Sequence, residues 1–84
     1  MTDQDTNVVG RLVAAVDLGS NSFHVTVAKL TASGLQIVMR DRERVRLASG
    51  LDDADQLDDA SIARGVEALQ RFDARLSAVE PAAI

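Results

Sequence analysis

Apolar and polar positions along the chain predict three strands before the first helix. Residues 12 to 18 form a short, almost uninterrupted apolar run, which is typical of a strand buried on both faces. Residues 23 to 30 alternate between apolar and polar instead, which predicts a second strand. The turn sequence of residues 31 to 34 ends in a glycine that tolerates positive φ, and a third strand is expected over residues 35 to 47. We therefore expect a three-stranded antiparallel meander.

The second and third strands are each predicted to have two different faces, because successive side chains of a strand point to opposite sides. In the second strand, one face carries Phe23, Val25 and Val27 and the other carries His24, Thr26 and Ala28. In the third strand, one face carries Arg40, Arg42, Arg44 and Arg46 and the other carries Met39, Asp41, Glu43, Val45 and Leu47.

An acidic loop is expected to lead into one amphipathic helix. The loop covers residues 47 to 59 and lacks the ligand spacing of a calcium-binding loop. The helix is predicted from about residue 60 to 78, with Asp58 or Asp59 as its N-cap. The face expected to pack on the sheet is Ile62, Val66, Leu69, Phe72, Leu76 and Val79. Pro81 stops the helix, and residues 82 to 84 are expected to begin another buried strand.

Composition limits the classes of protein to which the chain can belong. Its 84 residues allow one small domain or part of a larger one, and the absence of Cys excludes disulfides and thiolate metal sites. A net charge of -4 argues against a sequence-independent nucleic-acid binder. No apolar run is long enough to cross a membrane. The acidic residues 1 to 10, predicted to be a disordered leader, do not resemble a signal peptide, so we expect a cytoplasmic location.

Candidate chemistry is concentrated where the first strand ends, in an Asp followed by the sequence Gly-Ser-Asn-Ser. Gly19 lets the backbone come close to a ligand, and successive N–H groups in a tight turn can bind an anion. Ser20, Asn21 and Ser22 add short hydroxyl and amide donors, which suit phosphate oxygens. Asp17 offers a hard carboxylate oxygen of the type that binds Mg²⁺. The segment predicts a phosphate and magnesium site, although the same residue types also form ordinary hairpin turns.

Three strings of residues resemble one known family. They are AAVDLGSNSFHVTVAKL, ERVRLASGLD and ARGVEALQRFDARL, and they extend from about Ala14 to the end of the chain. In this order they resemble the Ppx/GppA phosphatase family of the actin, hexokinase and Hsp70 superfamily, and the block DLGSNSFH is highly specific to that family. The resemblance implies an α/β fold in which residues 11–84 form an incomplete ribonuclease-H-like (actin-like ATPase) domain: the three-stranded meander, one helix and a strand stub.

The resemblance also implies an activity for the parent protein. Members of this family are phosphoanhydride hydrolases that release the terminal phosphate of inorganic polyphosphate or guanosine pentaphosphate with Mg²⁺ as cofactor. Asp17 matches the family's metal-linked acid, and Gly19 to Ser22 match its first phosphate loop. Arg44 and Arg46 fall in the family-like string ERVRL and are candidate contacts to the polyanion.

The resemblance is incomplete, because the family's second phosphate loop and its catalytic Glu have no counterpart in the chain. No residue is therefore assigned as catalytic, and the chain alone is expected to be inactive. The parent protein is expected to be a homodimer that acts on polyphosphate or guanosine pentaphosphate, without nucleic-acid or membrane partners.

Two other interpretations of the function stay open. The chain can be a non-catalytic phosphate-binding or interaction module, or part of a sugar-kinase-like ATPase, although the block SNSFH argues against the kinase. His24 follows the loop directly, but its alternating position favours a packed or hydrogen-bonded strand residue over an acid or base. Arg40 and Arg42 are interpreted as part of a solvated strand face.

Overall fold

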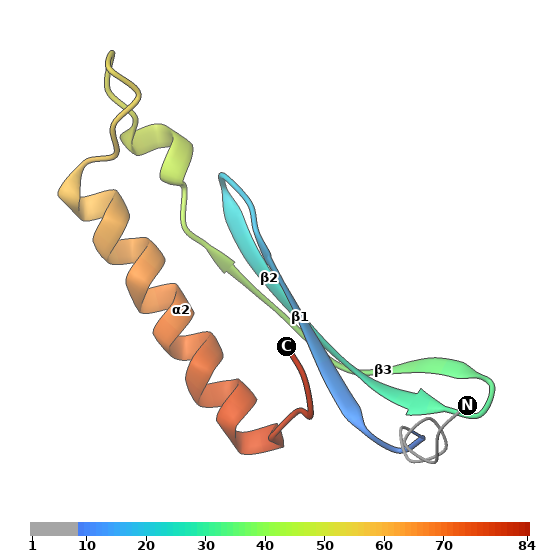
Figure 1. The fold of residues 1–84 in the computed structure, drawn as a ribbon. Helices are drawn as coiled ribbons and strands as arrows, with labels where there is room; N and C mark the ends of the chain where they lie inside the picture. Colours follow the sequence, from blue (N-terminus) through green and yellow to red (C-terminus); the bar gives the residue numbers. More distant parts are fainter. Residues whose placement is uncertain (1–8) are drawn as a thin grey trace.

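The structure is a computed structural model that describes residues 9–84, which form one antiparallel sheet and one long helix (Figure 1). The strands are β1 (Leu12–Leu18), β2 (Ser22–Thr31) and β3 (Gly34–Arg44), in the order β1-β2-β3. The predicted antiparallel meander is confirmed. Of the predicted leader, residues 1–8 lie outside the described residues, and Gly10 donates its backbone N–H to the Leu30 carbonyl at 2.6 Å.

The turn between β2 and β3 has the backbone conformation that its sequence favours. Gly34 has a φ of 136°, which L-residues rarely adopt and glycine tolerates. Thr31 supports the turn, because its Oγ1 donates to the Gly34 carbonyl at 2.8 Å. The predicted turn at this position is confirmed.

Helix α2 (Asp59–Val79) begins and ends at local capping signals. Asp58 accepts the backbone N–H of Ser61 at 2.7 Å, which satisfies one of the N–H groups left free in the first turn. Glu80 closes the last turn with a left-handed φ of 50° and an N–H bond to the Leu76 carbonyl at 2.8 Å. The predicted helix bounds are confirmed to within one residue. Among residues 9–84, no helix has the length and apolar character that a membrane crossing requires.

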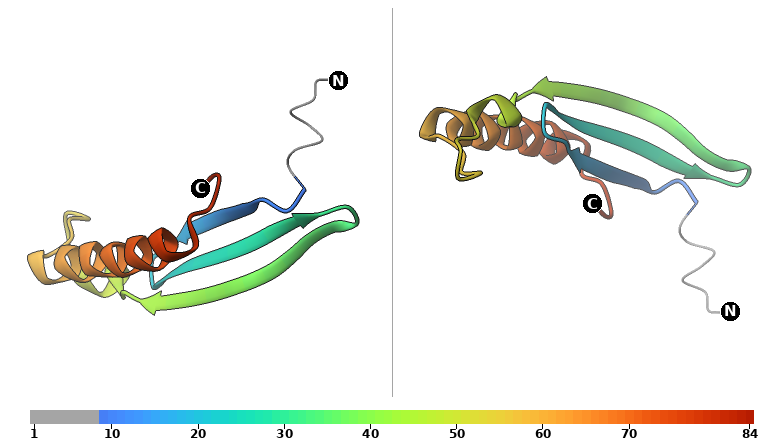
Figure 2. Two further views of the ribbon diagram at one scale, coloured as in Figure 1. Left: turned by 90° about the horizontal axis from the view of Figure 1, so that it is seen from below. Right: turned by 90° about the horizontal axis from the view of Figure 1, so that it is seen from above.

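The last residues of the chain extend the sheet beside β1. Ala83 forms a parallel bridge with Val13. Ala14 donates its N–H to the Ala83 carbonyl at 2.9 Å, and Ala82 donates to the Leu12 carbonyl at 2.7 Å. Figure 2 shows this C-terminal segment next to β1. The predicted opening of another strand is therefore confirmed at this bridge, but the prediction that it is buried is wrong for this chain, because residues 82–84 are exposed.

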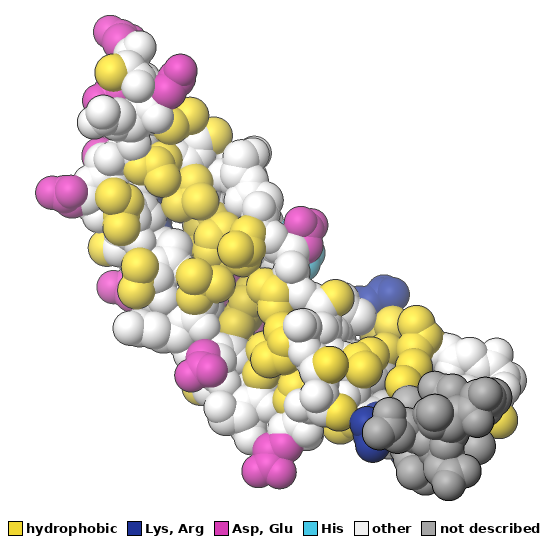
Figure 3. Space-filling view, viewed as in Figure 1, with side chains coloured by type: hydrophobic (Ala, Val, Ile, Leu, Met, Phe, Trp, Pro, Cys, Tyr) yellow, Lys and Arg dark blue, Asp and Glu magenta, His cyan; other side chains and the backbone are white. Residues whose placement is uncertain are grey.

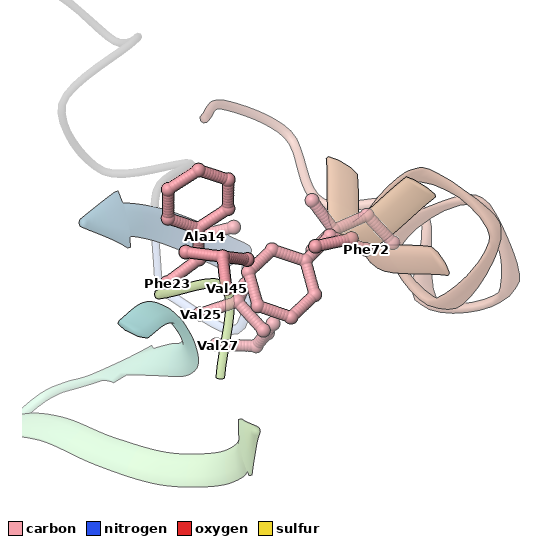
Figure 4. Packing of buried hydrophobic residues seen from close by; sticks show 8 residues of the cluster. Ala14, Phe23, Val25, Val27, Val45 and Phe72 are labelled. Atoms are coloured by element: carbon pink, nitrogen blue, oxygen red, sulfur yellow. The ribbon is translucent and has the colours of Figure 1, made fainter. Parts of the chain in front are cut away.

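The core lies between α2 and one face of the sheet (Figure 4). Phe23, Val25 and Val27 of β2 are at most 4% exposed, as their alternation predicts. Phe72 of α2 is 2% exposed and points toward these strand residues and Val45. One layer of side chains therefore holds the helix on the sheet.

The prediction that β1 is buried on both faces is wrong for this chain. Ala14 is the one buried residue of β1, and Asp17 and Leu18 at its end are exposed. The cause is that α2 covers one face of the sheet and no element of residues 9–84 covers the other (Figure 2). The Cα radius of gyration of 16.4 Å accordingly exceeds the value of about 12 Å expected for a compact domain of this length.

The predicted sheet-facing stripe of α2 is wrong in its first half. Phe72 and Leu76 are buried as expected, but Ile62, Val66 and Leu69 are 41% to 48% exposed. Figure 3 shows a band of hydrophobic side chains along α2. The residues that are buried in place of these three are Ser61, Gly65 and Ala68.

Small residues are required on this part of α2 because the helix comes close to the rest of the chain. A Cβ atom at Gly65 would lie 3.5 Å from Cδ2 of Leu47 and 3.8 Å from the ring of Phe23. A side chain much larger than a methyl group has no room there. The hydrophobic periodicity of the sequence does not reveal this close approach.

Strand β3 ends before its predicted limit at residue 47. Arg46 has left-handed backbone angles (φ 50°, ψ 47°), and Leu47–Gly50 form the short 3-10 helix η1. An extended strand does not continue through a left-handed residue. The predicted loop therefore starts with a turn of helix. Residues 34–38 of β3 are all exposed, and exposed and less exposed residues alternate only from Met39 to Arg44.

Candidate anion-binding site

The polar turn that follows β1 is closed by its own backbone. Gly19 donates its N–H to the Ser22 carbonyl at 3.1 Å. A Cβ atom at Gly19 would lie 2.8 Å from that carbonyl oxygen, so the turn itself requires glycine. Because this N–H is used within the turn, it is not one of the free N–H groups of an anion-binding nest.

The segment that follows β3 is hydrogen-bonded to the same turn. The Asn21 carbonyl accepts the N–H groups of Val45 and Arg46 at 2.8 and 2.9 Å. The Ser20 carbonyl accepts the N–H of Ala48 at 3.1 Å. These bonds place two segments that are distant in the sequence side by side.

An open hollow with a volume of about 310 Å³ lies between the turn and this segment. Its lining residues are Asn21, Ser22, Arg44, Arg46 and Ser49. They contribute two guanidinium groups, one amide and two hydroxyls, and no carboxylate. All of these groups can donate hydrogen bonds, and guanidinium groups match the oxygens of carboxylates and phosphates. The hollow therefore has the chemistry of an anion-binding site.

The guanidinium groups of the hollow are available to a ligand. Arg44 and Arg46 are exposed, and the ion pairs found within residues 9–84 are made by Arg71 and Arg75 instead. The structure thus brings together four of the residues singled out in the sequence. Asn21 and Ser22 come from the turn region, Arg44 from the end of β3 and Arg46 from the segment after it.

Three of the predicted site residues do not line the hollow: Asp17, Gly19 and Ser20. Asp17 is nevertheless on the same face of the sheet. It lies opposite His24 in the β1–β2 register, and Ser22 lies opposite Arg44 in the β2–β3 register. Since paired residues and residues two apart share a face, Asp17 and Arg44 both lie on the face away from α2.

Asp17 fits one mode of Mg²⁺ binding. Residues 9–84 contain no group of three or more His, Asp or Glu side chains that could hold a metal ion by themselves. Mg²⁺ is usually held by one or two carboxylates together with substrate phosphate oxygens rather than by a cage of protein ligands. Asp17 is an exposed carboxylate on the face that carries the hollow, so it suits a metal ion shared with a bound phosphate.

His24 was expected to be a packed or hydrogen-bonded strand residue, and the packed alternative is wrong for this chain because His24 is exposed. It lies between Asp17 and Arg42 in the register of the three strands. This position places the imidazole on the solvated face rather than in the core.

The acidic residues of β3 face α2 and not the hollow. Glu43 accepts from Arg71 at 2.7 Å and from Arg75 at 3.2 Å, and Asp41 also pairs with Arg75. The hydrogen bond from Arg71, supported by Arg75, holds the pKa of Glu43 below its ordinary value of 4.5. The two faces of β3 therefore carry opposite charges, and the positive one faces the hollow.

Ser49 is the lining residue that sequence reasoning missed. It becomes part of the hollow because the left-handed turn at Arg46 redirects the chain into η1. Its Oγ donates to the Arg46 carbonyl at 2.8 Å. Arginine is not a residue type that signals a left-handed conformation, so the sequence contained no local indication of this turn.

The chain is similar to proteins of one family. The model of the Ppx/GppA phosphatase family matches residues 26–84, a range that includes Arg44, Arg46 and Ser49 and begins after the polar turn. The guanosine-5'-triphosphate,3'-diphosphate pyrophosphatase of Pseudoalteromonas atlantica is 49% identical over 65 residues. These residues are 77% of this chain and 13% of that protein, so the chain spans a small part of the relative's length.

Solved structures show the same fold. The Ppx/GppA phosphatase of Aquifex aeolicus superimposes with a TM-score of 0.80 at 19% identity, over 87% of this chain and 24% of that one. An exopolyphosphatase from Cytophaga hutchinsonii has a TM-score of 0.80 at 17% identity, over 88% of this chain and 24% of that one. The expected fold, part of an actin-like ATPase domain, is therefore confirmed.

Proposed function

The chain belongs to the Ppx/GppA phosphatase family, and we propose that it forms a substrate-binding part of a phosphoanhydride hydrolase. The substrate is inorganic polyphosphate or guanosine pentaphosphate, from which the parent protein releases the terminal phosphate. The observation that supports this best is the hollow in which Asn21 and Ser22 meet the guanidinium groups of Arg44 and Arg46. The names of the pyrophosphatase and exopolyphosphatase relatives agree with this substrate class.

Electrostatics explains why this hollow suits a condensed phosphate. Neighbouring phosphoryl groups carry several negative charges, and the two guanidinium groups offer planar donors that match their oxygens. The amide of Asn21 and the hydroxyl of Ser22 add neutral donors, which orient the anion without adding charge, whereas the Ser49 hydroxyl donates to the Arg46 carbonyl. Because the hollow is open, a phosphate chain can extend from it into solvent.

The chain supplies only part of the proposed active site. Asp17 would hold Mg²⁺, which neutralises charge on the phosphate groups when it is bound. The sequence contains neither the family's second phosphate loop nor its catalytic Glu. We therefore assign binding rather than hydrolysis to the 84-residue chain. We also propose that the parent protein is a homodimer located in the cytoplasm.

The binding of inorganic tripolyphosphate to the chain, measured by isothermal titration calorimetry, tests this function. Arg44→Gln and Arg46→Gln are each expected to weaken binding by about tenfold, since each removes one charge-assisted contact. Arg40→Gln is the matched control, because it makes the same change of charge on the same face of β3 outside the hollow. We expect it to change the affinity by less than about threefold, because salt screens separated surface charges.

Two results would contradict the proposal. Equal weakening by Arg40→Gln and Arg44→Gln would mean that tripolyphosphate binds to general positive charge, and the interaction module would then be the better account. Release of phosphate by the 84-residue chain alone would show that it hydrolyses the substrate without the missing parts.

A further inference from the structure

Arg46 has a backbone conformation that arginine rarely adopts. Its φ of 50° and ψ of 47° lie in the left-handed region, where Cβ crowds the backbone of any residue other than glycine. The pattern of residues 35 to 47 predicted an extended backbone at this position. Such a conformation persists only when surrounding contacts hold it, and it often marks a functional site.

The carbonyl of Arg46 is held by several donors. Ser49 donates to it through its N–H at 3.3 Å and through its Oγ at 2.8 Å. Nη2 of Arg64 donates to it at 3.2 Å from the first turns of α2. The N–H of Arg46 is bound in turn to the Asn21 carbonyl at 2.9 Å. Arg64 is the contact that connects this turn to the helix.

The guanidinium group of Arg64 bridges three acceptors. Its Nε donates to the Val45 carbonyl at 2.9 Å, and its Nη2 donates both to the Arg46 carbonyl and to Ser61 Oγ, the latter at 2.9 Å. Ser61 is fully buried, so it holds Nη2 in a fixed position. The planar fork of arginine can reach these acceptors together, whereas the single ammonium group of lysine cannot reproduce this geometry.

Arg64 does not line the hollow, but it holds the segment that does. Arg64 binds the carbonyls of residues 45 and 46. Along the chain, the lining residue Arg44 comes directly before these carbonyls and the lining residue Ser49 comes after them. If Arg46 became extended, the chain would continue in the direction of β3, and Ser49 would leave the hollow. The spacing of the two guanidinium groups and the Ser49 hydroxyl therefore depends on the backbone of residues 45 and 46.

We propose that Arg64 is a positioning residue for a condensed-phosphate ligand. It keeps Arg46 left-handed through the carbonyls of Val45 and Arg46, and thereby sets the arrangement of the donors in the hollow. This inference rests on the proposed function to the extent that the ligand is a phosphate chain. The conformational claim about Arg46 can be tested without any ligand.

The test compares Arg64→Lys, Arg64→Gln and the control Arg71→Gln. Arg64→Lys keeps the charge and loses the fork, whereas Arg71→Gln removes a charge from the same helix at an ion pair with Glu43 that faces away from the hollow. Two quantities are measured: the Cα and Cβ chemical shifts of Arg46, which report its backbone conformation, and the affinity for tripolyphosphate. Circular dichroism verifies that each variant is folded.

Both Arg64 variants are expected to move the Arg46 shifts toward extended values and to weaken tripolyphosphate binding by about tenfold. Arg71→Gln is expected to leave the Arg46 shifts and the affinity unchanged. If both Arg64 variants unfold, Ser61→Ala takes their place, because it removes the acceptor that orients Nη2 of Arg64. It is expected to move the Arg46 shifts in the same direction and to weaken tripolyphosphate binding by about threefold.

The outcomes separate this inference from the proposed function. Unchanged Arg46 shifts in folded Arg64→Lys, or in Ser61→Ala, would overturn the positioning role. Wild-type affinity in Arg64→Lys together with weak binding by Arg64→Gln would mean that only the charge of Arg64 matters for tripolyphosphate binding. This result would also overturn the positioning role. A wild-type chain that does not bind tripolyphosphate would reject the proposed function, while the Arg46 shifts would still decide whether Arg64 fixes the turn.

Discussion

Gly50 of η1 lies against Ser61 of α2 so closely that no side chain fits between them. A Cβ atom at Gly50 would lie 1.8 Å from Ser61 Oγ and 2.9 Å from Asp58 Oδ1. Both Gly50 and Ser61 are buried, and Asp58 caps the helix that starts there. The segment that lines the hollow is therefore packed directly on the first turn of α2.

Gly50→Ala is expected to lower the free energy of unfolding by about 1 to 3 kcal/mol, because the methyl group overpacks this contact. Gly65→Ala is the control on the buried face of α2 that also carries Ser61, since its Cβ would meet Leu47 at an ordinary distance of 3.5 Å. Alanine is also favoured over glycine within helices, so this variant is expected to be more stable by up to about 1 kcal/mol. Urea unfolding measures both changes, and equal destabilisation of the two variants would contradict the packing described for Gly50.

Stability is expected to fall in acid partly through Glu43. Because its pKa is lowered in the folded chain, its stabilising contribution is fully present above the ordinary value of 4.5 and is lost as the pH falls through the folded pKa. Melting temperatures measured between about pH 6 and pH 3 should therefore fall less in Glu43→Gln than in the wild type.

A residual dependence on pH is expected in Glu43→Gln from Asp58, whose pKa is lowered by hydrogen bonding to Ser61. Glu67→Gln changes the charge of an exposed residue of α2 in the same way and serves as the control. A wild-type response to acid in Glu43→Gln would show that the pairs with Arg71 and Arg75 do not contribute to stability.

Asp17→Asn is expected to remove the effect of Mg²⁺ on tripolyphosphate binding and to preserve binding in its absence. The reason is that Asp17 is proposed to contact the metal ion, whereas the side chains of the hollow are proposed to contact the phosphate directly. Calorimetric titrations with and without Mg²⁺ measure this difference, with Asp73→Asn on the exposed surface of α2 as the control. An Asp17→Asn variant that keeps the full Mg²⁺ effect would exclude Asp17 as a metal ligand.

Two residues of the helical stripe are expected to differ strongly in their contribution to stability. Phe72→Ala should lower the free energy of unfolding by about 3 to 5 kcal/mol, because the ring fills the core. Val66→Gln should change it by less than about 0.5 kcal/mol, because Val66 is 47% exposed. Urea unfolding compares the two, and a large loss in Val66→Gln would mean that Val66 packs in the core, as the sequence pattern alone suggested.

Features that depend on neighbouring residues were the ones that could be predicted. The capping bond from Ser61 to Asp58 and the positive φ of Gly34 each follow from a few adjacent residues. The alternation in β2 follows from the geometry of a strand, which places Phe23 and Val25 on one face in any environment. Asn21, Ser22, Arg44 and Arg46 were singled out from residue types and a family resemblance, and the structure brings them together at one hollow.

Features that depend on contacts between distant segments were not predicted. The end of β3 and the inclusion of Ser49 follow from the left-handed Arg46, which is held by bonds to Asn21 and Arg64. The buried face of α2 was assigned to large residues, because periodicity does not measure how closely a helix approaches its neighbours.

The sequence by itself determined the order and type of the three strands and of α2, because hydrogen bonding within a helix, the alternation of a strand and the residues of a turn are local properties. It also singled out four of the five residues that line the hollow, Asn21, Ser22, Arg44 and Arg46. The tertiary structure decided which of them share a site, because the packing of η1 on α2 and the bonds of Arg64 bend the chain at Arg46. That bend is formed only when residues far apart in the sequence meet, so the arrangement of the hollow is a property of the folded chain.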